Sequence, residues 1–155
     1  MDTEIALTTA PRRWLRLALA LLAVEMFVIG LPAALAPDWF FRSFPFGRGW
    51  VASTGPYNEH SMLDLGYVYV AFGIVLAWAA VRPVRELTRA ALAAALVANV
   101  PHLIFHLSHT RQLPLADDVA QSLLLALPTA ITIAALLLTL RLPGEGRPPA
   151  GHSRR

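Results

Sequence analysis

The sequence predicts an all-α fold, a bundle of four transmembrane helices with both termini in the cytoplasm. Hydrophobic residues make up 56% of the 155 residues and charged residues only 15%. A soluble domain has roughly 45–50% apolar residues and about 25% charged residues. Four apolar stretches are each long enough to cross about 30 Å of hydrocarbon at about 1.5 Å per residue. The basic side chains other than histidine are all arginines, and most of them fall on one side of the predicted membrane, which indicates the orientation.

The first span is predicted over residues 15–36, after a basic flank that contains Arg12, Arg13 and Arg16. A basic flank and an apolar run also begin a signal peptide, but the apolar core there is only about 7–15 residues long. The run here is longer, and Pro37 directly follows the Ala-Leu-Ala segment that resembles a cleavage site. We therefore interpret this span as a retained transmembrane helix.

Three further spans are predicted over residues 58–81, 87–109 and 118–140. Residues 37–57, between the first two spans, hold half of the chain's Phe, Trp and Tyr side chains. Aromatic side chains are enriched where a membrane meets water. This loop is therefore expected to lie at the level of the lipid headgroups or to fold back over the helix ends.

The distribution of arginine predicts the orientation. Ten arginines lie before the first span, between the second and third spans, after the fourth, or within the first three residues of a span that begins on that side, and three lie in the other two connections. Because arginine-rich loops stay in the cytoplasm, both termini are expected there. Residues 1–142 then form one membrane domain, and residues 143–155, rich in Pro, Gly and Arg, are expected to be a disordered cytoplasmic tail.

Composition also indicates location and partners. Arginine without lysine, together with abundant Ala and Leu, is typical of a GC-rich bacterial genome, so the predicted location is the bacterial cytoplasmic membrane. The lipid bilayer is the expected partner. The arginines form no continuous basic face, which excludes a nucleic-acid partner.

The second span carries ionisable side chains, which are costly inside a membrane and therefore indicate function. His60 and Asp64 are four residues apart and share one helix face, which Tyr67 continues. Glu59 lies about 100° around the helix from His60. It is therefore closer than His60 to a stripe of small residues that includes Gly66. Such a stripe favours the close approach of another helix, and Glu59 also suits a helix N-terminus.

The third span carries a stripe of polar side chains. At about 100° per residue, the stripe occupies roughly an 80° arc and consists of Asn99, His102, His106 and His109. Three imidazoles on one face, at spacings of four and three residues, form a pattern typical of metal ligands. A single histidine in such a place is more often a core or interfacial residue.

The predicted topology brings the two motifs to the same depth. The second span begins outside and the third ends outside, so both motifs are expected near the outer leaflet. We therefore predict that His60 and Asp64 approach His102 and His106 across the two helices.

Polar residues of the other two spans are expected near this site. The fourth span begins at the same level with Asp118 and Gln121. Glu25 of the first span lies roughly 17 Å below its outer end at about 1.5 Å per residue. Glu25 is interpreted either as a proton relay or as a carboxyl group that burial keeps neutral.

Two of these segments resemble motifs of a known group of proteins. Residues 56–64 read PYNEHSMLD and residues 100–109 read VPHLIFHLSH. They resemble the PYNEH…D and VPHLxFHLxH motifs of a group of small, uncharacterised bacterial integral membrane proteins. The resemblance extends to the start of the aromatic loop and to residues 116–121. It implies a four-helix architecture and no particular activity.

The first candidate function is the binding of a transition metal or haem in the outer half of the bundle. Imidazole and carboxylate ligands suit zinc, iron, manganese or copper, and haem would require His60 to face the third span. The expected metal ligands are His60, Asp64, His102, His106, His109 and Glu59.

Two alternatives need no metal. The same groups suit acid–base or proton-coupled chemistry on a lipid or a small solute, with relay or supporting residues at Glu25, Asn99, Tyr67, Asp118 and Gln121. In the other alternative the protein is an accessory subunit, and its polar residues hold helices together beside a membrane protein partner or a second copy of the chain.

Overall fold

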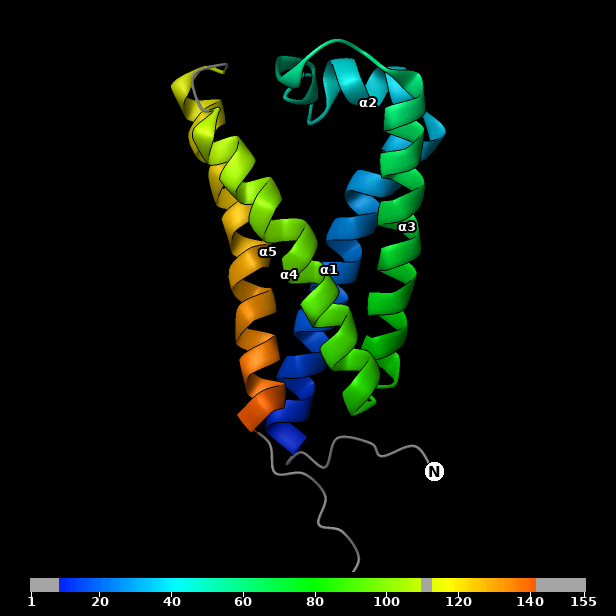
Figure 1. Ribbon diagram of the computed structural model, residues 1–155, viewed down its shortest axis with the longest axis vertical. Helices are drawn as coiled ribbons and strands as arrows, with labels where there is room; N and C mark the ends of the chain where they lie inside the picture. Colours follow the sequence, from blue (N-terminus) through cyan, green and yellow to red (C-terminus); the bar gives the residue numbers. More distant parts are fainter. Residues whose placement is uncertain (1–8, 110–112, 142–155) are drawn as a thin grey trace, which may run out of the picture.

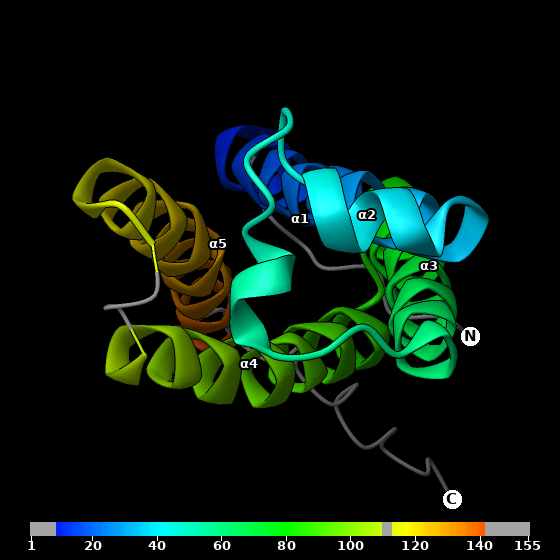
Figure 2. The ribbon, with the colours of Figure 1, turned by 90° about the horizontal axis from the view of Figure 1, so that it is seen from above.

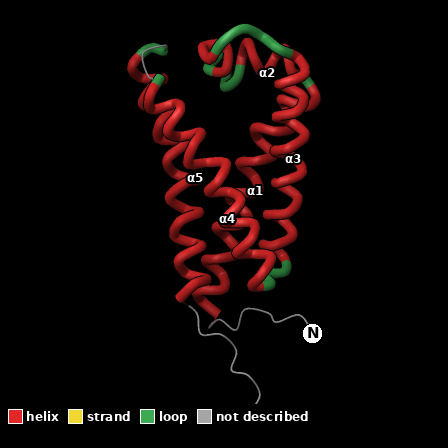
Figure 3. The backbone as a smooth tube through the Cα atoms, viewed as in Figure 1, coloured by secondary structure: helices red, strands yellow, loops and turns green. Residues whose placement is uncertain are grey.

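The computed structural model describes residues 9–109 and 113–141. Its elements follow one another along the chain as α1 (Thr9–Leu35), the short helix α2 (Pro37–Ser43), the 3-10 helix η1 (Val51–Thr54), α3 (Glu59–Val81), α4 (Arg85–Ser108) and α5 (Leu115–Arg141). Within these two described ranges all regular structure is helical (Figure 3). The four long helices are each long and apolar enough to cross a membrane. The predicted all-α fold with four helices long and apolar enough to span a membrane is thus confirmed, and the predicted tail at residues 143–155 lies outside the described residues.

The four long helices form two pairs. α1 packs along α3, and α4 packs along α5. The pairs lie together where α1 begins and α5 ends, and they diverge toward the opposite end, where α2 and η1 lie between them (Figures 1 and 2). We call the end with α2 and η1 the capped end, and the opposite end, where α1 begins and α5 ends, the terminal end.

Small residues hold α1 against α3. A Cβ atom added to Gly66 would lie 2.4 Å from the backbone nitrogen of Ala34, and one added to Gly30 would lie 2.8 Å from the Cβ atom of Tyr69. No side chain fits into such spaces. The predicted small-residue stripe of the second span is therefore confirmed as a close helix–helix contact, of the kind that drives association inside membranes.

The apolar core occupies the terminal half of the bundle. Its buried members lie in the first half of α1 and α4 and in the second half of α3 and α5; the largest are Leu15, Leu19, Leu22, Leu76 and Leu92. The outward faces of the same helices expose many large apolar side chains, which suits contact with lipid. The polar residues singled out from the sequence lie from the middle of the bundle toward the capped end.

The aromatic loop folds back over the helix ends, which is one of the two arrangements that the sequence predicts. α2 and η1 lie across the capped end (Figure 2), and three aromatic side chains of this loop, Phe40, Phe41 and Trp50, are buried. The segment between α2 and η1 also bonds to the start of α5, because Arg48 Nη1 lies 2.5 Å from Asp117 Oδ1. Residues 37–54, which we call the cap, therefore contact both helix pairs.

Candidate polar site at the capped end

The rings of the histidine stripe of α4 stack in two separate pairs. The rings of His102 and His106 stack with centroids 4.7 Å apart and planes 20° apart. One turn further, His109 stacks on Phe105 at 4.3 Å. α4 continues through Pro101 without a break. His102 and His106 are partly buried, whereas His109 is exposed at the helix end.

His106 contacts α5 through a hydrogen bond. Its Nδ1 atom lies 3.0 Å from Oε1 of Gln121. Because an amide oxygen only accepts, Nδ1 carries the hydrogen and donates it, and Nε2 is left as an acceptor. The acidic residues Asp117 and Asp118 stand in the first turn of α5, where the helix dipole stabilises negative charge.

His102 contacts the other helix pair. Its Nδ1 atom lies 3.5 Å from the hydroxyl oxygen of Tyr69 on α3. The helix spacing from His60 and Asp64 indicated Tyr67 instead, and that side chain is 59% exposed. Tyr69 comes three residues after Gly66, on the face that packs against α1. The position of Tyr69 on the same face as the small-residue stripe was therefore the sequence signal that could have identified it as a site residue.

Glu25 and Asn99 lie at the inner end of this polar region. Glu25 on α1, Tyr69 on α3 and Asn99 on α4 are each about 15 Å from the capped end of their helices at about 1.5 Å per residue. Within the described ranges, the buried atoms Oε2 of Glu25 and Nδ2 of Asn99 have no hydrogen-bond partner.

The structure does not bring the two predicted motifs together. His60 Nε2 lies 3.3 Å from Asp64 Oδ2, and these side chains are 85% and 61% exposed. They stand at the start of α3, whereas the end of α4 leans away to pair with α5 (Figure 1). In the part of the chain that the structure describes, no three His, Asp or Glu side chains converge as metal ligands.

Glu59 acts at a helix start. It is the first residue of α3 and is exposed. The preceding Asn58 caps the helix, because its side-chain oxygen accepts a hydrogen bond of 3.1 Å from the Ser61 backbone nitrogen. This position matches the interpretation of Glu59 as a helix N-terminal acid, and it agrees with the predicted N-terminus of the span.

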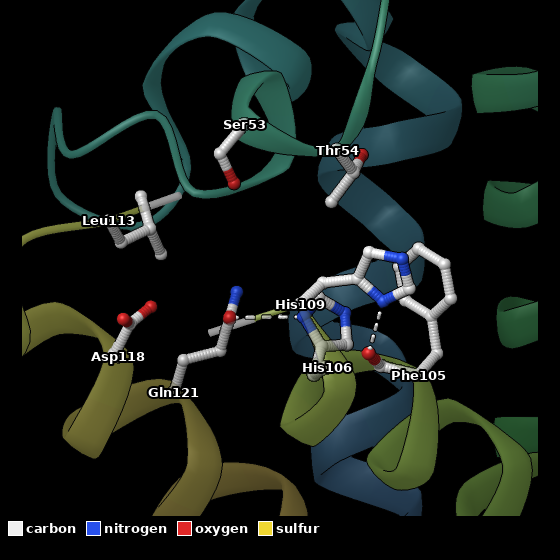
Figure 4. A pocket seen from close by; sticks show the side chains of 8 residues that line it. All are labelled: Ser53, Thr54, Phe105, His106, His109, Leu113, Asp118 and Gln121. Carbon is white, nitrogen blue, oxygen red and sulfur yellow. Dashed lines mark hydrogen bonds between the residues drawn. The ribbon is translucent and has the colours of Figure 1, made fainter. Parts of the chain in front are cut away.

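A pocket lies between η1, the end of α4 and the start of α5 (Figure 4). Its empty volume, including the mouth, is about 310 Å³, and its lining consists of Ser53, Thr54, Phe105, His106, His109, Leu113, Asp118 and Gln121. Four residues predicted from the third and fourth spans thus share one site: His106, His109, Asp118 and Gln121. Ser53 and Thr54 come from the aromatic loop, in which no motif indicated a site.

Comparison with family models, with curated proteins and with solved structures found no match to this chain. The resemblance to small bacterial four-helix membrane proteins therefore stays an expectation from the two motifs.

Proposed function

We propose that this multi-pass membrane protein is a metal-free, proton-coupled binding protein for a small polar solute. The solute binds in the pocket at the capped end. Protons move between this pocket and the middle of the bundle through His106, His102, Tyr69 and Glu25. Because the rings of His102 and His106 stack face to face, water would carry the proton between their ring nitrogens. With both termini in the cytoplasm of a bacterial cell, as the arginine distribution favours, the pocket faces the outside.

The placement of His106 supports this function most strongly. Its side chain lines the pocket, its ring stacks on His102, and His102 reaches the hydroxyl of Tyr69. Imidazole and phenol groups bind and release protons, and rows of titratable side chains inside membrane helices are typical of proton relays. This row leads from the pocket toward the interior, where the carboxyl group of Glu25 follows.

The inner end of the row suits ordered water. Oε2 of Glu25 and Nδ2 of Asn99 are buried and lack a partner among the described residues. Buried polar groups are normally bonded to protein or to water. Water molecules at these two atoms would extend the row beyond Tyr69, and their hydrogen-bonded chain would carry protons.

Proton flux into liposomes tests the proposal. The purified protein is reconstituted with a pH-sensitive dye inside the vesicles, and a membrane potential is imposed with potassium and valinomycin. His102→Ala is expected to lower the flux about tenfold or more, because a positioned acid–base group contributes roughly 10²–10⁴-fold to proton transfer. Tyr69→Phe, which removes only the hydroxyl group, is expected to lower it as well.

His60→Ala is the matched control. His60 is also an imidazole at the capped end, but its contact is to Asp64 on its own helix. Its removal is expected to leave the flux unchanged. Equal flux in the wild type and His102→Ala would contradict the relay.

A transition metal or haem is the second candidate, and one observation favours it. Nδ1 of His106 is hydrogen-bonded to Gln121 and Nδ1 of His102 contacts Tyr69. Metal-ligating histidines commonly have one ring nitrogen held in this way, which leaves the other nitrogen for the metal. The two histidines are one turn apart, so a zinc, iron, manganese or copper ion would bind them with further ligands from solvent.

Metal analysis separates the two candidates. The protein purified in detergent is analysed for bound metal, and its absorption spectrum is recorded. A stoichiometric metal that is lost in His106→Ala, or a haem Soret band, would favour the second candidate. Proton flux in metal-free protein favours the first.

A further inference from the structure

The hydroxyl groups of Ser53 and Thr54 in the pocket donate their hydrogens to backbone carbonyl oxygens. Ser53 Oγ lies 2.6 Å from the Trp50 carbonyl oxygen, and Thr54 Oγ1 lies 2.7 Å from the Val51 carbonyl oxygen. A carbonyl oxygen only accepts, so in both contacts the hydroxyl group is the donor. Toward a ligand, Ser53 and Thr54 therefore offer only acceptor lone pairs.

The two imidazoles of the pocket are also left as acceptors. Nδ1 of His106 donates to the amide oxygen of Gln121. Nδ1 of His109 lies 2.8 Å from the Phe105 carbonyl oxygen, which fixes the hydrogen on Nδ1 by the same argument. In each neutral ring Nε2 is the bare nitrogen, and it accepts.

Asp118 adds a negative charge to this set. Its carboxyl group has no ion-pair partner in the described part of the chain, whereas the adjacent Asp117 is paired with Arg48. Figure 4 shows Asp118, Gln121 and Ser53 around the same space. The amide nitrogen of Gln121 is the one donor among the polar side chains of the lining.

We infer that this pocket binds a primary ammonium group, which supplies three donors, no acceptor and one positive charge. Such a group complements an acceptor-rich lining with one unpaired carboxylate. Phe105 and Leu113 provide apolar walls for the carbon chain of the ligand. This inference deepens the proposed function, on which it rests for the role of the pocket, by naming the chemical class of the solute.

The geometry favours an ammonium group over a metal ion. A metal requires ligand atoms within about 2.0–2.2 Å of one point, and no three such side chains of the described residues converge. Hydrogen bonds to an ammonium ligand span about 2.7–3.0 Å each and allow a wider arrangement.

Two sources present this group at the end of a membrane helix. One is a free small amine from solution, and the other is the ethanolamine headgroup of a phospholipid. Both offer the same ammonium group to Asp118. The experiment therefore has one arm for each source.

In the first arm, ethanolamine is titrated into the full-length protein in detergent, and binding is measured by calorimetry. Two matched probes accompany it: ethylene glycol, which lacks the charge, and choline, which has the charge but no N–H donor. Ethanolamine is expected to bind at least about tenfold more tightly than either probe, because charge-assisted hydrogen bonds are the stronger ones. In the second arm, thermal unfolding is compared in nanodiscs of phosphatidylethanolamine and of phosphatidylcholine.

Asp118→Asn is the decisive variant, since it keeps the shape and removes the charge. It is expected to weaken ethanolamine binding about tenfold or more, or to abolish the extra stability in phosphatidylethanolamine. Asp64→Asn, an exposed carboxylate on α3, is the control and is expected to change neither. An Asp118-dependent effect in either arm supports the inference and identifies the source.

The inference is overturned if neither arm shows an effect, if ethylene glycol or choline binds as tightly as ethanolamine, or if Asp118→Asn binds like the wild type. It is also overturned if zinc binds with dependence on Asp118 and ethanolamine does not. Binding in detergent does not require proton movement. Asp118-dependent binding without a His102-dependent flux would therefore remove the proton relay and leave the ammonium site in place.

Discussion

Arg48, between α2 and η1, is bonded to Asp117 at the start of α5, with Nη1 and Oδ1 2.5 Å apart. The Asp117 side chain is only 12% exposed, whereas that of Arg48 is 54% exposed. α2 itself packs on α1 and α3. This ion pair therefore joins the cap to the second helix pair, directly beside the pocket that Asp118 and Gln121 line.

Arg48→Ala is expected to loosen the cap. The change leaves the buried carboxylate of Asp117 without its partner, which costs more than the loss of an exposed pair. Hydrogen–deuterium exchange of the backbone in residues 44–54 is expected to become faster. Arg42→Ala is the control, because Arg42 and Asp38 form an exposed pair within α2 of the kind that contributes only about 0–1 kcal/mol. Equal exchange in the two variants would show that the aromatic side chains alone hold the cap.

Gly66→Val is expected to destabilise the contact between α1 and α3. A Cβ at this position would lie 2.4 Å from the backbone of Ala34. The backbone cannot move away to relieve such a clash, whereas the end of a flexible side chain can. Overpacking typically costs about 1–3 kcal/mol, so the thermal unfolding midpoint in detergent should fall. Ala71→Val, on the exposed side of the same helix, is expected to leave the midpoint unchanged. If both variants unfold alike, the close approach of the two helices is not what stabilises the pair.

His106→Ala is expected to give a folded protein that no longer moves protons. The hydrogen bond to Gln121 is one interhelical bond, and such bonds in membranes average only about 0.6 kcal/mol. Thermal unfolding should therefore change little while the proton flux into liposomes falls. If the flux persists in this variant while Glu25→Ala prevents folding, the polar residues act as contacts between helices, and the accessory-subunit interpretation is favoured.

Single cysteines test the orientation. The natural chain has no cysteine, so each variant reports one position. Ser53→Cys, in η1 at the capped end, is expected to react in whole cells with a thiol reagent that does not cross membranes. Arg82→Cys, between α3 and α4 at the terminal end, is expected to react only after the cells are opened. The reverse result would contradict the orientation that the arginines indicate.

The sequence alone determined the elements of this protein. The length and apolarity of four stretches indicated four membrane helices, since a helix must be about 20 residues long to cross the hydrocarbon. The second span was predicted to begin at residue 58, where the Asn58 cap of α3 is found. The aromatic content of residues 37–57 indicated a loop at the lipid headgroups or over the helix ends, and the structure has the second arrangement. Each of these properties depends on local chemistry, which a sequence records directly.

The tertiary structure decided which polar residues meet. The spacing on α4 showed that His102 and His106 share a face, but it did not show which helix that face approaches. Inside a membrane, lipid is as apolar as the side chains, so the apolar pattern does not mark the inward face. α3 turns its glycines to α1, and α4 leans toward α5 at the capped end. His106 therefore meets Gln121, and His60 stays with Asp64 on its own helix, because the packing of small residues and not the polar pattern fixed the helix pairs.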